Sequence, residues 1–99
     1  MTINKTTEGS KLTIALEGRL DTVTAPELEG ELAGSTQGVK ELVFDLKDLD
    51  YVSSAGLRVL LSAQKTMKKQ GSMTIRGVKE EIMEIFDVTG FVDILNIEE

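Results

Sequence analysis

The strongest restriction on the fold comes from a compact apolar run in the middle of the chain, Glu-Leu-Val-Phe-Asp-Leu at residues 41–46. Because its apolar residues are nearly continuous rather than alternating, the run is typical of a strand that is covered on both faces. Such a strand belongs inside a sheet with helices packed against it. The chain has 99 residues, which fits one small domain, so we expect a single unit over residues 1–99.

Two segments before this run predict a hairpin followed by a helix. Residues 11–17 alternate between apolar and polar, as a half-buried strand does, and residues 2–7 are the candidate partner strand. Gly18 is expected to end the second strand. A capping-box spacing with a proline at residues 24–27 then begins a short predicted helix that ends near Gly34.

The second half of the chain continues to alternate between helix and strand. The serine pair at residues 53–54 supplies a helix cap, and apolar residues then recur at helical spacing until Gly71. Residues 72–76 alternate as a strand, residues 78–88 carry apolar side chains on one helical face, and residues 93–97 predict a last edge strand.

The predicted order is therefore strand, strand, helix, strand, helix, strand, helix, strand. This order indicates an α/β fold with a mixed sheet of about four to five strands, parallel crossovers and helices packed against the sheet.

Composition argues against several classes of function. The net charge of −6 argues against direct nucleic-acid binding, because phosphate contacts need clustered lysine and arginine. The chain has no cysteine and no histidine, which removes thiol chemistry, Ser-His-Asp hydrolysis and histidine-ligated zinc. Neither common glycine-rich phosphate-binding motif occurs. We therefore expect no metal and no cofactor.

The chain also lacks the pattern of a membrane protein. Its N-terminal stretch has no continuous apolar segment, and nowhere do eighteen apolar residues follow one another. We expect a cytoplasmic protein without membrane insertion.

Two enzymatic interpretations depend on particular residues. An apolar strand ending in Asp45 resembles the opening of haloacid-dehalogenase-type phosphatases, but Lys47 occupies the place of the second aspartate. The acidic pair within residues 48–50 is displaced from the expected strand end, and a solvated acidic turn is the favoured interpretation. A Ser-Lys hydrolase using Ser54 needs a buried lysine nearby, whereas the lysines within residues 65–69 lie about three turns away along the same helix.

Ser54 has a structural and a functional interpretation. Taken alone, a serine at a helix start is a cap. In context, the hydroxyls of Ser53 and Ser54 with small residues beside them form an accessible spot at a helix N-terminus. A phosphate placed there meets free backbone N–H groups and the positive end of the helix dipole.

Three strings of residues, in the right order, resemble the STAS domain of the stand-alone anti-sigma-factor antagonist type found in bacteria. The first is Gly-Arg-Leu-Asp at residues 18–21. The second runs from the apolar strand at 42–46 to Tyr-Val-Ser-Ser-Ala-Gly-Leu at 51–57, and the third is Ile-Phe-Asp-Val-Thr-Gly-Phe at 85–91. The resemblance covers essentially the whole chain and implies a STAS-like mixed sheet.

The resemblance also implies a site. In the family, the serine two residues before the glycine accepts phosphate from a cognate anti-sigma factor serine kinase, and this position is Ser54, with Ser53 as the alternative acceptor. Ser53 stands where the family often has aspartate, Ala55 stands where it often has serine or threonine, and Arg58 replaces a common small residue. The implied partner-binding residues are Asp21, Thr22, Ser53, Ser54, Ala55, Gly56 and Arg58.

By the same resemblance, the chain is a binding protein and not an enzyme. The unphosphorylated form sequesters the anti-sigma factor and so releases a sigma factor, phosphorylation blocks this contact, and a serine phosphatase restores it. A monomer is the default state for such a switch. The alternatives are a STAS subunit that docks on a transporter ATPase or another signalling scaffold, and the small phosphatase considered above.

Overall fold

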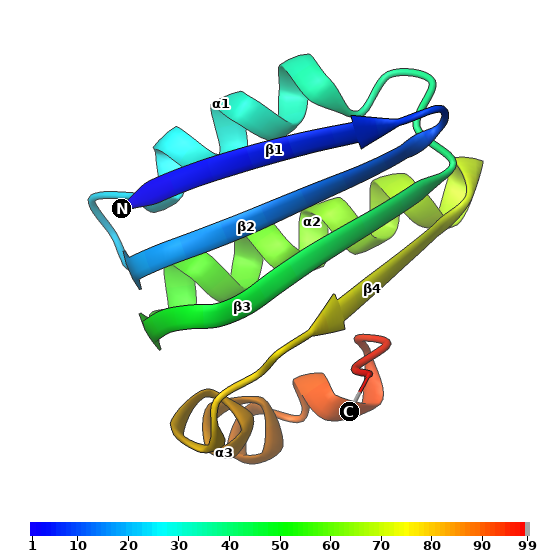
Figure 1. Ribbon diagram of the computed structural model, residues 1–99. Coiled ribbons are helices and arrows are strands. Elements are labelled where there is room, and N and C mark those ends of the chain that lie inside the picture. The colour runs from blue at the N-terminus through cyan, green and yellow to red at the C-terminus, as the bar shows by residue number, and fades with distance from the viewer. Residues whose placement is uncertain (99) are drawn as a thin grey trace.

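The computed structural model describes residues 1–98 and is built on a four-stranded mixed sheet (Figure 1). Strand β1 (Thr2–Glu8) pairs antiparallel with β2 (Lys11–Leu20), which pairs parallel with β3 (Glu41–Val52). Strand β4 (Ser72–Arg76) pairs parallel with β3 on its other side. The hairpin, the mixed sheet and the parallel crossovers predicted from the sequence are confirmed. Glu99, the last residue of the expected domain, lies outside the described residues.

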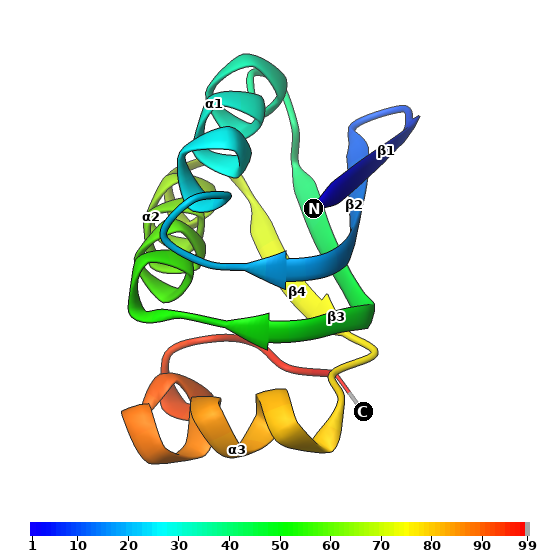
Figure 2. The same ribbon diagram turned by 90° about the vertical axis from the view of Figure 1, so that its left-hand side faces the viewer.

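Three helices accompany the sheet. Helices α1 (Ala25–Ser35) and α2 (Ser54–Gln70) lie side by side on one face of it, as Figure 2 shows. Helix α3 (Glu80–Thr89) lies apart from them, below the sheet in both views, and is followed by the 3₁₀ turn η1 (Phe91–Asp93). Within residues 1–98, no helix combines the length and apolar character needed to cross a membrane.

The core lies between the sheet and its helices. In β2 the alternate residues Leu12, Ile14 and Leu16 are buried, as their period-two spacing predicts. In β3 the run Leu42–Phe44 is buried without interruption, so this strand is indeed covered on both faces. Full burial of one such side chain contributes about 1.5–3 kcal/mol, so this run contributes several kcal/mol to the stability of the fold.

Both long strands extend further than the sequence indicated. Strand β2 does not end at Gly18 but continues to Leu20 through register shifts against β3. Gly18 has a φ of +101°, a backbone conformation that glycine adopts readily, so the strand bends there without stopping. Strand β3 continues to Val52, so residues 48–50 are not the expected acidic turn. They lie in the strand, where the buried side chain of Leu49 holds them.

Two local expectations near helix and chain ends were wrong. Thr24 precedes α1 without a side-chain capping bond, because its hydroxyl is used in the preceding turn. The last edge strand expected over residues 93–97 is reduced to one bridge between Ile75 and Ile97. The chain instead forms a turn closed by hydrogen bonds to the Phe91 carbonyl, and this turn buries Leu95.

Candidate functional site

The two serines at the start of α2 have different surroundings. Ser53 is the N-cap, and its Oγ accepts a hydrogen bond from the Gly56 N–H at 3.3 Å. Its own backbone N–H donates to the Leu20 carbonyl at 2.9 Å, and its side chain is half-buried. Ser54 is the first residue of the helix and is exposed. The capping function expected of the pair therefore belongs to Ser53, and the accessible hydroxyl belongs to Ser54.

Gly56 allows α2 to begin directly on the ends of two strands. A Cβ atom at this position would lie 2.7 Å from Leu20 Cγ and 2.9 Å from Val52 Cγ2, closer than such atoms can pack. Leu20 and Val52 are themselves register partners in β2 and β3. The small residue in the Ser-x-Gly string thus fixes Ser54 at the carboxyl edge of the parallel strands. Gly56 is buried and presents no side chain to a partner.

Asp21 organises the turn between β2 and α1. Its Oδ1 accepts hydrogen bonds from the backbone N–H groups of Val23 and Thr24, at 3.0 and 3.1 Å. In return, the Thr24 hydroxyl oxygen accepts from the Asp21 N–H at 2.8 Å and donates to the Arg19 carbonyl at 2.8 Å. The bond from the Thr24 backbone, helped by the Val23 N–H and the nearby Arg19, holds the pKa of Asp21 below its usual range. The Asp-x-x-Thr spacing is the sequence signal for this turn.

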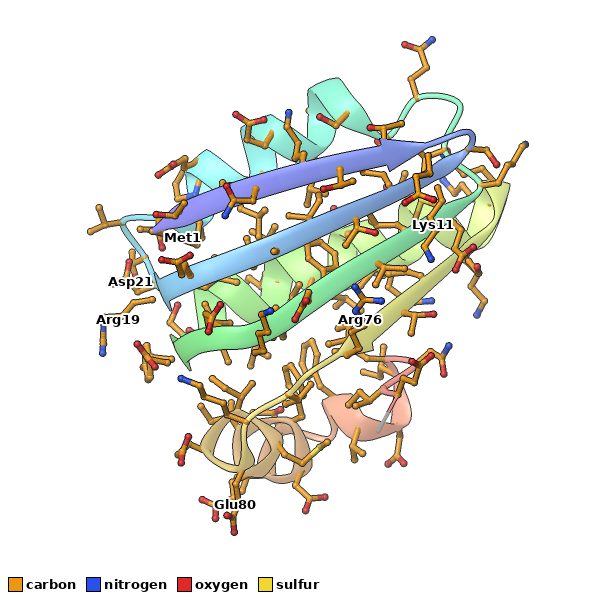
Figure 3. All side chains as sticks on the ribbon, in the orientation of Figure 1. Met1, Lys11, Arg19, Asp21, Arg76 and Glu80 are labelled. Carbon is orange, nitrogen blue, oxygen red and sulfur yellow. The ribbon has the colours of Figure 1, made fainter. Side chains whose placement is uncertain are left out.

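Arg19 and Tyr51 extend this edge; both belong to the strings that carry the family resemblance, but neither was predicted as a site residue. The Arg19 guanidinium lies 4.4 Å from the centre of the Tyr51 ring, and the two residues are register partners in β2 and β3. Arg19 Nε also lies 3.8 Å from Asp21 Oδ2. Figure 3 shows Arg19 and Asp21 together at the end of β2. The stacked Arg19 guanidinium and the Asp21 carboxylate therefore lie together where β2 leads into α1.

A shallow groove joins α1 to the start of α2. Its volume is about 210 Å³, and its lining residues are Thr22, Ala25, Pro26, Glu29, Ala55, Arg58 and Val59. Three residues predicted from the family resemblance, Thr22, Ala55 and Arg58, therefore meet in one concave surface. The groove residues on α1 were not predicted from the sequence, because none of the three strings that carry the resemblance includes α1. Arg58 provides a cation one helical turn after Ser54.

Two acidic residues of β3, Asp45 and Asp50, are engaged in other contacts. Asp45 Oδ1 accepts from the Lys47 N–H at 3.2 Å, and its Oδ2 lies 3.9 Å from the Arg76 guanidinium. Asp50 pairs with Lys79 at the start of α3, with 2.5 Å between Oδ1 and Nζ. Among residues 1–98 no three carboxylates gather in a way that could hold a metal ion. These carboxylates thus connect neighbouring segments of the fold.

Comparison with known proteins identifies the family and relatives that carry the name of anti-sigma factor antagonist. The profile of the STAS domain matches residues 2–99. BtrV of Bordetella bronchiseptica, whose name carries the provisional assignment of anti-sigma factor antagonist, is 38% identical over 88 residues, covering 87% of this chain and 76% of BtrV. The anti-sigma-B factor antagonist of Bacillus subtilis is 34% identical over 85 residues, covering 85% and 78% of the two chains.

Solved structures share the fold at lower identity. The Bacillus anti-sigma factor antagonist SpoIIAA in its unphosphorylated form superposes with a TM-score of 0.77 at 12% identity, over 99% of this chain and 88% of that one. Its phosphorylated form gives a TM-score of 0.76 at 13% identity, over 99% and 92%. At these identities the likeness concerns the fold alone.

Proposed function

The chain belongs to the STAS domain family, and we propose on this basis that it is an anti-sigma-factor antagonist switched by phosphorylation of Ser54. In this proposal the unphosphorylated chain binds an anti-sigma factor serine kinase and so releases a sigma factor. The same kinase then phosphorylates Ser54, which breaks the contact, and a serine phosphatase restores it. The chain acts by binding in the cytoplasm, as a single-domain monomer, and catalyses no reaction itself.

The exposed position of Ser54 at the first turn of α2 is the observation that carries this proposal. A kinase must reach a hydroxyl without unfolding its substrate, and Ser54 meets this condition beside the groove formed by Thr22, Ala55 and Arg58. Ser53 is the poorer phosphate acceptor, because its Oγ already accepts a hydrogen bond from the Gly56 N–H. Modifying Ser53 would also remove a helix cap, which typically contributes about 1 kcal/mol.

One phosphate supplies nearly all of the free energy that the switch needs. It adds about −1.5 to −2 charges at a helix N-terminus, where unpaired N–H groups and the helix dipole stabilise it, so the fold tolerates the modified state. In an interface, opposing like charges cost several kcal/mol. Moving a binding equilibrium from 99:1 to 1:99 takes about 5.5 kcal/mol. The solved forms of SpoIIAA, phosphorylated and unphosphorylated, support a switch that leaves this fold in place.

The surface that we assign to the partner centres on the groove. Thr22 and Ala55 lie on its two sides, and Arg58 supplies the nearest cation on α2. Asp21 contributes by shaping the turn that carries Thr22, since its Oδ1 is occupied by backbone N–H groups. Docking on a transporter ATPase is not favoured, because the relatives named above carry the antagonist name.

A capture experiment with variants tests the proposal. The wild-type chain, Ser54→Asp and the matched control Ser53→Ala are used as baits in lysate of the source cells, and intact masses are recorded with and without ATP. We expect the wild type and Ser53→Ala to retain a serine kinase and to gain one phosphate on Ser54, and Ser54→Asp to retain none. Capture of a transporter ATPase by all three baits, with no change in mass, would contradict the proposal.

A further inference from the structure

The negative charge of this protein is concentrated at one end of the chain. Residues 80–99 contain seven acidic and no basic side chains, whereas residues 1–79 contain ten acidic and eleven basic ones. The net charge of −6 thus originates in the segment that forms α3 and its continuation. Lys79, the cation nearest to this segment in the sequence, is paired with Asp50 of β3.

Helix α3 also carries apolar side chains outside the face of Ile82 and Phe86: Ile85 is partly buried against the core, and Val88 is exposed. Ile82 and Phe86 are fully buried in the core. Val88 points away from them and is 87% exposed, which makes it the most exposed large apolar side chain among residues 1–98. At helical spacing of three, four and seven residues, it shares a face with Glu81, Glu84 and Ile85.

This outer face forms a shallow hollow of about 300 Å³. The residues that line it are Glu81, Glu84, Ile85, Val88 and Thr89. The turn that follows α3 also leaves Val92 and Ile94 exposed, by 38% and 47%. A contiguous exposed apolar patch with a polar rim is a feature of protein interaction surfaces.

We propose that this acidic apolar face, defined by the five residues of the hollow, docks a cationic amphipathic segment of a protein partner. An apolar side chain of the partner packs on Ile85 and Val88, and flanking lysine or arginine residues face Glu81 and Glu84. A second copy that docks through the same face is disfavoured, because it would bring the same carboxylates against each other. An anionic membrane surface is disfavoured for the same electrostatic reason.

This face is separate from the Ser54 site. The Ser54 site lies at the start of α2, whereas Figure 2 shows α3 apart from both α1 and α2. The acidic apolar face therefore shares no residue with the groove beside Ser54.

Titration with a defined probe tests the docking face. The probe is a synthetic helical peptide with leucines on one side and lysines on the other, added to the isotope-labelled full chain and followed by amide chemical shifts. We expect the shifts to concentrate in residues 81–89. We expect Val88→Ser to weaken binding roughly tenfold, which corresponds to about 1.4 kcal/mol of apolar contact. Glu84→Lys should also weaken binding, and this loss should diminish as salt rises.

Matched controls make the experiment decisive. Val23→Ser removes an equally exposed valine, 84% accessible, from the turn before α1, and it should leave peptide binding unchanged. A scrambled peptide of the same composition, which has no apolar face, should bind more weakly. Equal binding by wild type and Val88→Ser, or shifts spread over the whole chain, would overturn the proposal. Binding to anionic vesicles, or self-association that Val88→Ser abolishes, would also refute the assigned occupant.

Discussion

The backbone N–H of Ser53 donates a hydrogen bond to the carbonyl oxygen of Leu20 at 2.9 Å, which joins the start of α2 to the end of β2. The next residue on the β2 side is Asp21, and the next residue on the α2 side is Ser54. One backbone contact therefore brings together the turn of Asp21 and the proposed phosphorylation site, which are more than thirty residues apart in the sequence.

Replacing Gly56 by alanine is expected to destabilise the fold. The new Cβ would lie 2.7 Å from Leu20 Cγ and 2.9 Å from Val52 Cγ2, and overpacking of this kind costs about 1–3 kcal/mol. Urea unfolding measures the change. Gly30→Ala in α1 is the matched control, because its Cβ would meet nothing within 4 Å and it should gain about 0.5–1 kcal/mol from helix propensity. Equal stability of Gly56→Ala and the wild type would refute the close-packing role.

The contribution of Asp21 to stability is expected to depend on pH. Hydrogen bonds in the turn hold its folded-state pKa below the ordinary value of 3.8. The stabilisation by the carboxylate is therefore fully present well above pH 3.8 and is lost as the pH falls through the lower folded-state pKa. The wild type should exceed Asp21→Asn in unfolding free energy by a constant amount from pH 7 to 5, and the gap should narrow in acid. Asp21→Ala should lower the unfolding free energy more than Asp21→Asn does, because alanine has no side-chain oxygen to accept the hydrogen bonds of the turn.

A gap between wild type and Asp21→Asn that grows towards acid pH would contradict this assignment. So would an Asp21→Ala variant as stable as the wild type at pH 7. In that case the carboxylate would have no role in the turn, and its place near Arg19 would call for a direct role in partner contact.

Local patterns predicted most of the fold, and tertiary contacts decided the remainder. The continuous burial of Leu42–Phe44 followed from the composition of that run. The extension of β3 to Val52 could not be predicted, because residues 47–50 are mostly charged and only their pairing with β2 makes them a strand. Similarly, the strand expected over residues 93–97 has the correct apolar alternation, but closure of the turn at Phe91 leaves a single bridge.

The candidate site was also predicted only in part, because local patterns group residues on one element and do not reveal contacts between elements. Ser54, Ala55 and Arg58 follow one another on α2, so a short string of residues was enough to group them. Arg19 and Tyr51 come from two strands that meet only through the sheet register, and no local pattern links them. Asp21 was assigned to the partner surface from the family resemblance, and the turn hydrogen bonds that its Oδ1 accepts were not predicted.

Alanine substitutions should distinguish the capping role of Ser53 from the phosphate-accepting role of Ser54. Ser53→Ala removes the oxygen that accepts from the Gly56 N–H, so it should lower the unfolding free energy by about 1 kcal/mol. Ser54→Ala removes an exposed hydroxyl and should stay within about 0.5 kcal/mol of the wild type. Urea unfolding gives both values, and intact mass after treatment with the kinase should show one phosphate on Ser53→Ala and none on Ser54→Ala. The reverse pattern would make Ser53 the acceptor.

Replacing Ser54 by aspartate should raise stability while it weakens partner binding. A carboxylate in the first turn of α2 interacts favourably with the helix dipole, and this interaction contributes about 0.3–1 kcal/mol at low salt. Urea unfolding at low and at high salt should show the gain and its loss by screening. A stabilised variant that no longer binds the kinase cannot owe the lost binding to unfolding, so the effect must arise in the interface. Tight binding by Ser54→Asp would instead exclude charge at this position as the basis of the switch.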